Sequence, residues 1–585
     1  MSLITRKILN KKELQPKILQ AITEICACFT DQYYDADVRV VLASYLLYKV
    51  GTEYKNPEIE YKDILSMNHD FDEDASIVIA ELISEEEWVR LIPLAKKYTP
   101  EVFACSAFIY TMTHNARMNK GSEFTPLSII KLAQRILKVE PNDRVADICS
   151  GFATFLTECA LDEPDALYFG CEINTTNKLI ADIRSRLVSD NINILLQDAF
   201  TLLDASNEYR FNKIFSNYPF KIPLRNMSVE KEQFQMLIDK YPGLGRATSS
   251  DWAFNALICE LLSDDGKAVA LMTNGSTWNS IDTPMRKQFI ENGLIESVIA
   301  LPERMFSTFS IPTTMVVFSK GNKNVRIVDA SNLYQPGRRY NTFSDEDVES
   351  ILAALDNDCD YSKVIEIDEL RQNDYSLSLS RYSADGITFE YATPFEEVIK
   401  SITRGAPCNA RQLDEMVSDT ATHMQYLMLS NIQNGIIEDN LPYLSHIDAK
   451  YEKYCLKDND LILSKNGYPY KLAIAKVSKD HKILANGNLY IIELDQDRID
   501  PYYLKAFFES EQGIAILKSI TVGATIPNIG VDSLKKIMIP VPPMEQQKRI
   551  SEQYQMTLDE IAVYKLKLEK AFSKLHHIFD NESEG

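Results

Sequence analysis

Hydrophobic and polar positions follow two different patterns along the chain. In the first 118 residues apolar side chains recur at three- and four-residue intervals, as at Ile18, Ile22 and Ile25, which predicts a helical accessory domain over 1–118. From about residue 144, short apolar runs alternate with helix-like segments. Strands alternating with helices at this spacing indicate βαβ units. The fold class predicted for 119–345 is therefore α/β, with a Rossmann-like, doubly wound and mostly parallel sheet. The apolar runs cover 144–148, 167–171, 192–196 and 213–215.

The pattern changes again in the last third. Residues 346–387 are charged and rich in turn formers, which predicts a linker, and 388–545 consist of short strands and turns, which predicts a separate α+β domain. A long amphipathic helix is expected over 546–580, spanning about eight turns. Its stripe packs either on its own domain or on a partner helix. The stripe consists of Ile550, Tyr554, Leu558, Ile561, Leu568, Phe572, Leu575 and Phe579.

Composition narrows the class of protein. A chain of 585 residues is too long for one core, and 45% apolar with 25% charged residues is ordinary for a globular protein. No apolar run approaches the roughly 18 residues of a membrane span, and the N-terminus has no secretory signal pattern. The ten cysteines are scattered without a Cys-x2-Cys pair, which predicts no metal site and reduced thiols in the cytoplasm. The net charge of −22 argues against a general nucleic-acid coat and leaves room for a local basic cleft.

Acidic side chains end three of the predicted strands. Asp147 lies at the end of the first strand, before a turn of small residues that contains Gly151, and Glu172 ends the second strand. Asp198 follows the third. In open α/β sheets a small-residue turn lets the backbone approach a ligand, and a carboxylate ending the second strand commonly holds ribose hydroxyls. These four residues predict a site for a nucleoside-containing cofactor. The turn lacks the full Gly-x-Gly-x-x-Gly expected of a nicotinamide enzyme.

The fourth strand leads into Asn217-Tyr218-Pro219-Phe220. Asn217 offers an amide oxygen, the carbonyl of Tyr218 offers a second acceptor, and Pro219 stiffens the turn. Phe220 supplies a flat face. Two acceptors beside an aromatic ring suit a planar group carrying an NH2, such as an adenine turned out of a duplex.

This tetrapeptide resembles the Asn-Pro-Pro-aromatic motif of S-adenosylmethionine-dependent amino-methyltransferases, with Tyr218 where proline is usual. Residues 119–345 as a whole resemble the modification subunit of Type I restriction–modification systems, which are N6-adenine DNA methyltransferases. The resemblance implies that Glu172 holds the cofactor ribose, Asp198 the cofactor adenine and the Asp147–Gly151 turn the methionine part. The further segments that carry it are Phe124-Thr125-Pro126, Asp251 to Phe254, Lys267 to Met272, and Leu301 to Phe306 with Ile311 to Thr314; Phe124, Thr125 and Pro126 are expected near the cofactor, and Ala153 and Thr154 stand where relatives carry glycines.

The C-terminal third contains a basic, aromatic and turn-rich segment. Within 461–490 five lysines stand against one acid, Asp480, a composition that suits either a DNA surface or a solvated lysine face. Residues 388–580 resemble one target-recognition domain, with its following spacer helix, of a Type I specificity subunit. The most specific part is the Pro-Val-Pro-Pro-Met-Glu-Gln-Gln stretch before the helix. The predicted DNA-binding residues are Lys465, Tyr468, Tyr470, Lys471 and Lys476.

Together these resemblances imply a DNA methyltransferase with S-adenosylmethionine as cofactor and double-stranded DNA as partner. The amphipathic helix implies either a homodimer or a separate specificity or nuclease subunit, and no membrane partner is expected. A catalytically silent DNA-binding protein and an RNA or protein amino-methyltransferase are the alternatives. The sequence leaves open the DNA target, the oligomeric state, and a role in defence or in regulation.

Overall fold

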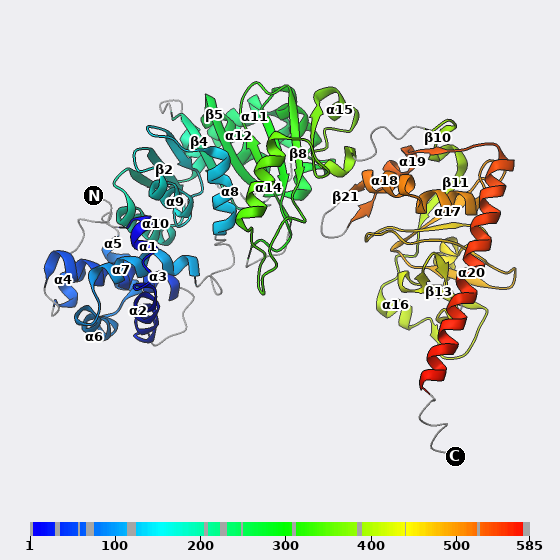
Figure 1. Cartoon of the computed structure of the whole chain (residues 1–585), viewed down its shortest axis with the longest axis horizontal. Helices are drawn as coiled ribbons and strands as arrows, with labels where there is room; N and C mark the ends of the chain where they lie inside the picture. Colours follow the sequence, from blue (N-terminus) through cyan, green and yellow to red (C-terminus); the bar gives the residue numbers. More distant parts are fainter. Residues whose placement is uncertain are drawn as a thin grey trace, which may run out of the picture. The chain divides into compact units, whose positions relative to one another are not determined.

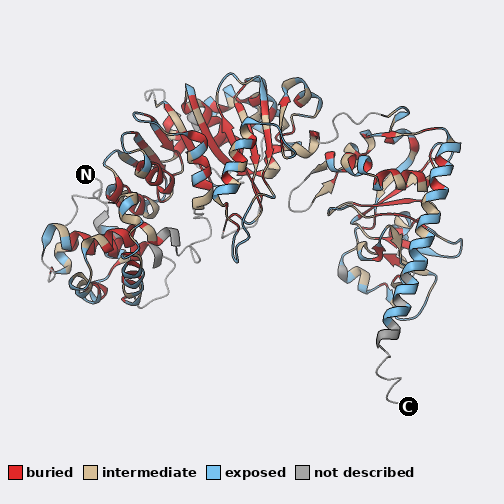
Figure 2. Ribbon diagram, in the orientation of Figure 1, coloured by how far each residue is buried: buried red, intermediate tan, exposed pale blue. Residues whose placement is uncertain are grey.

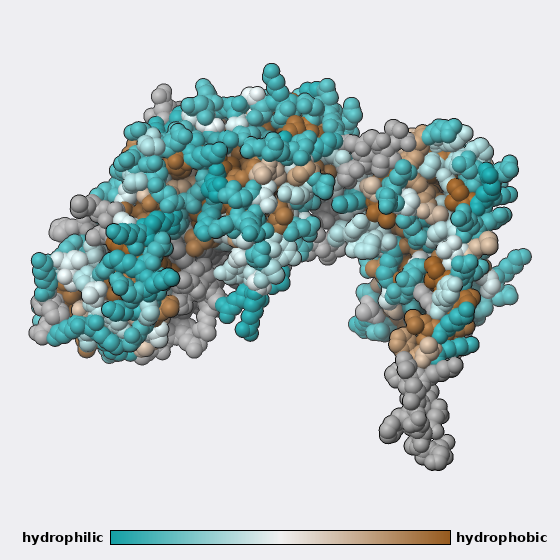
Figure 3. Space-filling view, viewed as in Figure 1, coloured by the Kyte–Doolittle hydropathy of each residue, from teal (hydrophilic) through white to brown (hydrophobic). Residues whose placement is uncertain are grey.

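The chain forms two compact units, Met1–Leu379 and Ser380–Gly585, in a computed structural model (Figure 1). In Figure 2 buried residues concentrate in the strands of the first unit, and in Figure 3 the visible face is mostly hydrophilic. The structure describes residues 4–29, 36–55, 59–65, 75–113, 125–203, 209–220, 222, 231–246, 250–306, 312–382, 389–438, 440–522 and 527–576.

The first unit begins with helices, as predicted. Helix α3 packs against α2 and α7, and both α3 and α7 also contact α10 of the following α/β part. One hydrophobic core joins these helices to the sheet, through residues such as Leu46, Phe108 and Ile180. These helices are α1 (Arg6–Leu9), α2 (Gln15–Ala27), α3 (Ala36–Lys49), α4 (Tyr61–Leu65), α5 (Ala75–Leu82), α6 (Glu85–Leu91) and α7 (Pro100–Thr113).

A nine-stranded sheet organises the rest of this unit, in the order β3-β2-β1-β4-β5-β7-β6-β8-β9. The first five strands in this order are parallel, β7 is antiparallel to both neighbours, and β9 is antiparallel to β8. All four predicted apolar runs are strands of the parallel part. The strands are β1 (Arg144–Asp147), β2 (Leu167–Glu172), β3 (Ile192–Leu196), β4 (Phe211–Ser216), β5 (Leu262–Thr273), β6 (Ile295–Ala300), β7 (Thr313–Phe318), β8 (Asn324–Asp329) and β9 (Ser362–Glu366).

Helices cover both faces of the sheet. Alternate residues of β5, Val269 and Leu271, join the core shared with the N-terminal helices, α8, α9 and α10. The intervening residues point to the opposite face, where Trp252 of α12 packs edge-on against Phe289 of α13 at 5.0 Å between ring centroids. The sheet is therefore doubly wound. Its helices are α8 (Leu127–Leu137), α9 (Thr154–Asp162), α10 (Thr175–Val188), α11 (Lys231–Lys240), α12 (Asp251–Leu261), α13 (Thr283–Glu291), α14 (Asp345–Asp356) and α15 (Ile367–Gln372).

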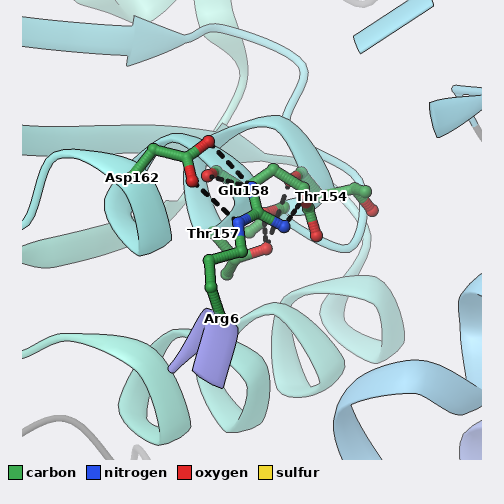
Figure 4. Close-up of polar contacts among 6 residues, drawn as sticks. Arg6, Thr154, Thr157, Glu158 and Asp162 are labelled. Atoms are coloured by element: carbon green, nitrogen blue, oxygen red, sulfur yellow. Dashed lines mark hydrogen bonds and ion pairs between the residues drawn. The ribbon is translucent and has the colours of Figure 1, made fainter. Parts of the chain in front are cut away.

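The N-terminal segment is tied to α9. The Arg6 guanidinium donates to both carboxylate oxygens of Asp162, at 2.7 and 2.8 Å, and to the Glu158 carboxylate at 2.6 Å (Figure 4). The hydrogen bonds to Asp162, with the charge of Glu158, raise the pKa of Arg6 above its usual value. Because α9 begins at Thr154, directly after the small-residue turn, this cluster anchors the helix that follows that turn.

The predicted linker over 346–387 is wrong for most of its length. Residues 345–356 form α14, and 362–366 form β9, which pairs with β8. Ser344 and Asp347 form a capping box: the Ser344 side chain accepts from the Asp347 N–H at 3.1 Å, and Asp347 accepts from the Ser344 N–H at 2.8 Å. Charged residues at 345–347 thus start a helix.

The second unit is built on small sheets. One has the order β11-β20-β17-β18, and a second the order β12-β16-β13-β19. Leu461 and Leu463 of β17 pack in one core and Ile462 in another, so this strand separates two apolar layers. The strands are β10 (Ala392–Pro394), β11 (Ile399–Arg404), β12 (Val417–Ser418), β13 (Met424–Leu427), β14 (Ile432–Gln433), β15 (Ile436–Ile437), β16 (Tyr443–Leu444), β17 (Leu461–Ser464), β18 (Leu472–Ile474), β19 (Lys482–Ala485), β20 (Leu489–Leu494), β21 (Thr521–Val522), β22 (Asn528–Ile529) and β23 (Met538–Pro540).

The predicted C-terminal helix is present as α20 (Met544–His576) and begins two residues before its predicted start. It packs on α17, and Gln547 and Ser551 on this side are buried. The Tyr554 hydroxyl binds the buried ammonium of Lys505 and the carboxylate of Glu509. The first third of α20 is thus fixed to its own domain. The other helices of this unit are α16 (Ala410–Asp414), α17 (Pro501–Glu509), α18 (Glu511–Ser519) and α19 (Val531–Lys536).

Candidate functional site

The sequence-predicted acids and Asn217 lie at one edge of the sheet. Asp147 and Glu172 are the last residues of β1 and β2, Asp198 comes two residues after β3, and Asn217 follows β4 directly. These four strands are neighbours and parallel, in the order β3-β2-β1-β4. Their carboxyl ends therefore share the edge where open α/β sheets bind ligands.

The turn after β1 is joined to the end of β2. The Gly151 N–H donates to Oε2 of Glu172 at 2.9 Å. Gly151 has a left-handed φ of +52°, and a β-carbon built on it would meet nothing within 4 Å, so its surface faces open space. Ala153 has the same φ of 52°, although an L residue is strained there. The chain thus adopts the shape that glycines allow at a position where it carries alanine.

Both carboxyl groups at this turn are buried, and each accepts a hydrogen bond from a backbone N–H. Burial raises the pKa of Asp147 to about 8, opposed by a hydrogen bond of 3.2 Å that Oδ1 accepts from the Cys149 N–H. Burial also raises the pKa of Glu172, whose Oε1 accepts from the Asn174 N–H at 2.8 Å. Oε1 also accepts from Nδ2 of Asn177 at 3.5 Å, so both of its lone pairs are used, and Oε2, which accepts from Gly151 only, retains acceptor capacity for a ligand hydroxyl. Asp198 is half-buried, and its Oδ1 accepts from the Phe200 N–H at 2.9 Å.

The side-chain amide of Asn217 is fixed on one side only. Its Nδ2 donates to Oγ1 of Thr125 at 2.9 Å. Its Oδ1 is buried and accepts no hydrogen bond from the residues that the structure describes. A buried amide oxygen without a donor costs about 1–3 kcal/mol. The amide is therefore held with an unused acceptor at the ligand-binding edge.

The Tyr218 side chain packs on α12. Its ring is buried and stacks on Phe254 of α12 at 4.8 Å and 8°, and its hydroxyl donates to Oδ1 of Asn255 at 2.9 Å. The tyrosine that replaces the usual proline is thus absorbed by the core. Pro219 is exposed, and the half-buried Phe220 lies edge-on to Phe306 at 6.2 Å.

Two supporting residues were missed by sequence reasoning. Arg184 of α10 is fully buried and donates to the carbonyl of Phe152 at 2.8 Å and to Oγ1 of Thr154 at 2.7 Å, so it holds the turn after Gly151. Burial lowers its pKa to about 10, and its guanidinium lies 5.0 Å from the Phe108 ring. For Arg184, the only feature of the sequence that could have indicated this role was an arginine on an otherwise apolar helix face. No feature of the sequence indicated a role for Asn255.

Phe124, Thr125 and Pro126 were predicted near the cofactor, and the structure describes the last two of them. Phe124 lies outside the described residues. Thr125 contacts Asn217, as given above, and Pro126 caps α8 at its N-terminus. Their placement near the cofactor stays a prediction.

The predicted DNA-binding residues of the second unit separate into two groups. Tyr468 is 51% exposed and Lys476 is exposed, while Lys465 is half-buried. Lys471 instead donates from Nζ to the carbonyls of Leu429 at 3.0 Å and Ile432 at 2.8 Å. Its ammonium holds a loop of its own domain, which argues against a DNA contact. The half-buried Tyr470 donates to Oγ1 of Thr521 at 2.9 Å.

Within the described residues, no group of histidine, cysteine or acidic side chains is arranged to hold a metal ion. Among the same residues, no helix combines the length and apolarity that crossing a membrane requires.

These features define the class of the first unit: a doubly wound α/β protein with a ligand-binding edge made by acids, a tight turn and one unsatisfied amide. Two family models match different parts of the chain. Residues 104–388 match the family model described as N-6 DNA Methylase, and 424–568 match Type I restriction modification DNA specificity domain. The chain therefore resembles an N-6 DNA methylase over one segment and a Type I specificity domain over a second, and the predicted resemblance is confirmed for both.

Curated relatives match about half of the chain. The Type I restriction enzyme MjaVIII methylase subunit of Methanocaldococcus jannaschii is 25% identical over 308 residues, which cover 47% of this chain and 52% of the relative. The MpnII methylase subunit of Mycoplasma pneumoniae is 24% identical over 331 residues, covering 52% and 61%. The chain thus spans between half and two thirds of the length of these relatives.

Two solved structures of similar proteins have TM-scores below 0.5. The Type I restriction-modification methyltransferase subunit of Streptococcus thermophilus has a TM-score of 0.49 at 18% identity, covering 63% of this chain and 98% of that chain. The type IIG restriction endonuclease BpuSI has a TM-score of 0.46 at 12% identity, covering 93% and 75%.

Proposed function

We propose that the protein is a site-specific DNA methyltransferase that transfers a methyl group from S-adenosylmethionine to N6 of adenine, within a restriction–modification system. The observation that carries the proposal is the Asn217 amide, with Nδ2 held by Thr125 and Oδ1 left as a buried, unused acceptor. An exocyclic amino group is the partner that this oxygen lacks. Adenine is the base that the family match indicates. A DNA substrate also implies that the protein acts in the cytoplasm.

The residues at the edge of the sheet fit the cofactor. Oε2 of Glu172 retains acceptor capacity for a ribose hydroxyl, and Asp198, two residues after β3, would accept from an adenine amino group. The open space at Gly151 admits the methionine part beside Asp147. When bound, S-adenosylmethionine supplies an activated methyl group on a sulfonium.

The chain's own residues would position the adenine. A flipped adenine costs a few kcal/mol of unstacking, and stacking on Phe220 returns about 1–3 kcal/mol. Asn217 Oδ1 and the carbonyl of Tyr218 would accept the two N6 hydrogens, which fixes the direction of the nitrogen lone pair. Since the Tyr218 ring is buried against Phe254, its carbonyl stays in the turn and is not displaced by its side chain. Positioning and electrostatics then supply the rate.

The test uses modification-sensitive, long-read sequencing of DNA from a methylation-free host that expresses the protein or its Asn217→Ala variant. N6-methyladenine at one motif, with the wild type only, is expected. The purified variant should keep its affinity for S-adenosylmethionine, because Asn217 acts on the base. Loss of cofactor affinity would contradict that role, and a wild type that neither marks DNA nor binds the cofactor would refute the proposed enzyme.

We further propose that the distal part of α20 pairs with another helix, from a second copy or from a separate specificity or nuclease subunit. Beyond Tyr554 the apolar side chains Ile561, Leu568 and Phe572 are 39%, 57% and 53% exposed. Helical spacing puts them on one side of α20. Sedimentation of the full chain should show a dimer that Leu568→Glu dissociates. A monomeric wild type would rule out the second copy as partner.

A further inference from the structure

Two cations that pair with no carboxylate of the described residues lie at one end of the sheet β11-β20-β17-β18. Arg404 is the last residue of β11, and Lys465 follows the last residue of β17; β20 lies between these strands. The register places Arg404 and Leu463 on either side of Tyr490. At a strand spacing of about 4.8 Å, the backbones of Arg404 and Leu463 are about 10 Å apart.

The turn that precedes β20 holds both residues. The Arg404 Nε donates to the Gly487 carbonyl at 2.7 Å, and the Lys465 N–H donates to the Asn488 carbonyl at 2.8 Å. The backbones approach closely here, because a β-carbon on Gly405 would lie 2.1 Å from the Asn486 carbonyl oxygen. This packing fixes where the Arg404 side chain leaves the sheet.

The charge of the pair is not neutralised. Other lysines of this domain have partners: Lys457 pairs with Glu493 at 2.8 Å, and Lys482 pairs with Glu452 at 2.8 Å. Neither Arg404 nor Lys465 forms an ion pair with any residue that the structure describes. Burial and the nearby Arg404 guanidinium lower the pKa of Lys465. Two nearby like charges destabilise the folded domain. We expect a domain to carry this cost where an anionic ligand supplies the missing negative charge.

We propose that Arg404 and Lys465 form a phosphate-binding pair through which the C-terminal domain grips the DNA backbone. The inference rests on the proposed function, and it replaces the broad lysine patch expected from the sequence with a defined pair that includes an arginine outside that patch. The exposed Tyr468 lies three residues after Lys465, in the turn after β17, where Gly467 leaves open space. Within the part of the chain that the structure describes, no carboxylate pairs with Arg404 or Lys465, so a phosphate would not have to displace one.

The test is the salt dependence of DNA binding. The full-length wild type, Arg404→Gln, Lys465→Gln and the double variant are titrated with a duplex that carries the methylated motif, between 50 and 200 mM salt. Each phosphate contact contributes about 0.9 to the slope of log affinity against log salt concentration. Each single variant should therefore lose about 0.9 of slope, which changes the wild-type-to-variant affinity ratio about 3.5-fold over this range. The double variant should lose about 1.8.

Two controls separate charge from structure. Lys400→Gln removes the same charge at the opposite end of β11, where Glu493 lies nearby, and should leave the slope unchanged. Arg404→Lys keeps the charge and should keep the slope. Equal slopes for the wild type and the double variant overturn the inference, as does a relaxed methylation motif at unchanged slope, which would mean base reading. A wild type that binds no duplex at 50 mM salt refutes the proposed function as well.

Discussion

Removing the Thr125 hydroxyl should slow methyl transfer without weakening cofactor binding. In the Thr125→Val variant the shape of the side chain is kept, but Nδ2 of Asn217 loses the acceptor that now lies 2.9 Å away. A buried donor left unsatisfied costs about 1–3 kcal/mol. The amide relieves this cost by rotating, and the rotation removes Oδ1 from the position in which it receives the amino group.

If that cost appears in the transition state, kcat falls about 5- to 150-fold, since 1.36 kcal/mol corresponds to a factor of ten. Single-turnover transfer from labelled S-adenosylmethionine measures the rate, and calorimetry measures cofactor affinity. Thr125→Ser retains the hydroxyl and should stay within a few-fold of the wild type. An unchanged rate for Thr125→Val would refute the reasoning. A loss of cofactor affinity with full activity at saturation would instead support the role near the cofactor that the sequence implied.

Two other perturbations follow from the site. Phe220→Ala should weaken capture of the flipped adenine by about 1–3 kcal/mol, measured as a rise in KM for DNA, and unchanged kinetics would count against stacking. Asp147 is protonated in the folded cofactor-free protein up to about pH 8 and ionised in the unfolded chain above about pH 4, so its contribution to stability is full below pH 4 and is lost as pH rises through 8. Denaturant unfolding should accordingly show Asp147→Asn gaining stability relative to the wild type as pH rises from 5 to 8.5; a difference independent of pH would contradict the buried, protonated carboxyl.

The sequence allowed prediction of those parts of the fold that depend on local periodicity. The four apolar runs became neighbouring parallel strands, and the acids at their ends were placed together because parallel strands share one carboxyl edge. The contact between Thr125 and Asn217 joins residues 92 positions apart, so it depends on how α8 packs on the sheet, and no local pattern encodes it. The hydrogen bonds of Arg184 to Phe152 and Thr154 also join residues far apart in the sequence, so no local pattern encodes them.

The error at 346–387 had a different cause. The segment from 346 is charged and rich in turn formers, which suggested a linker, although Ser344, followed three residues later by the acid Asp347, also matches a helix start. Strand β9 is short and lies at the edge of the sheet, where the hydrophobic pattern is weak. In the last third, lysine density indicated a basic surface but could not show that the Lys471 ammonium binds backbone carbonyls.

The core that runs from the N-terminal helices into the sheet has a consequence for how the protein unfolds and where a protease can cleave it. Phe108 of α7 covers the Arg184 guanidinium, and the N–H of Ile4 donates to the Leu187 carbonyl at 2.8 Å. Separating the N-terminal helices from the sheet would expose these residues to solvent. The helices and the sheet should therefore melt in one cooperative step. A protease can therefore divide this chain into folded pieces by cleaving near residue 380, where the two compact units meet in the sequence.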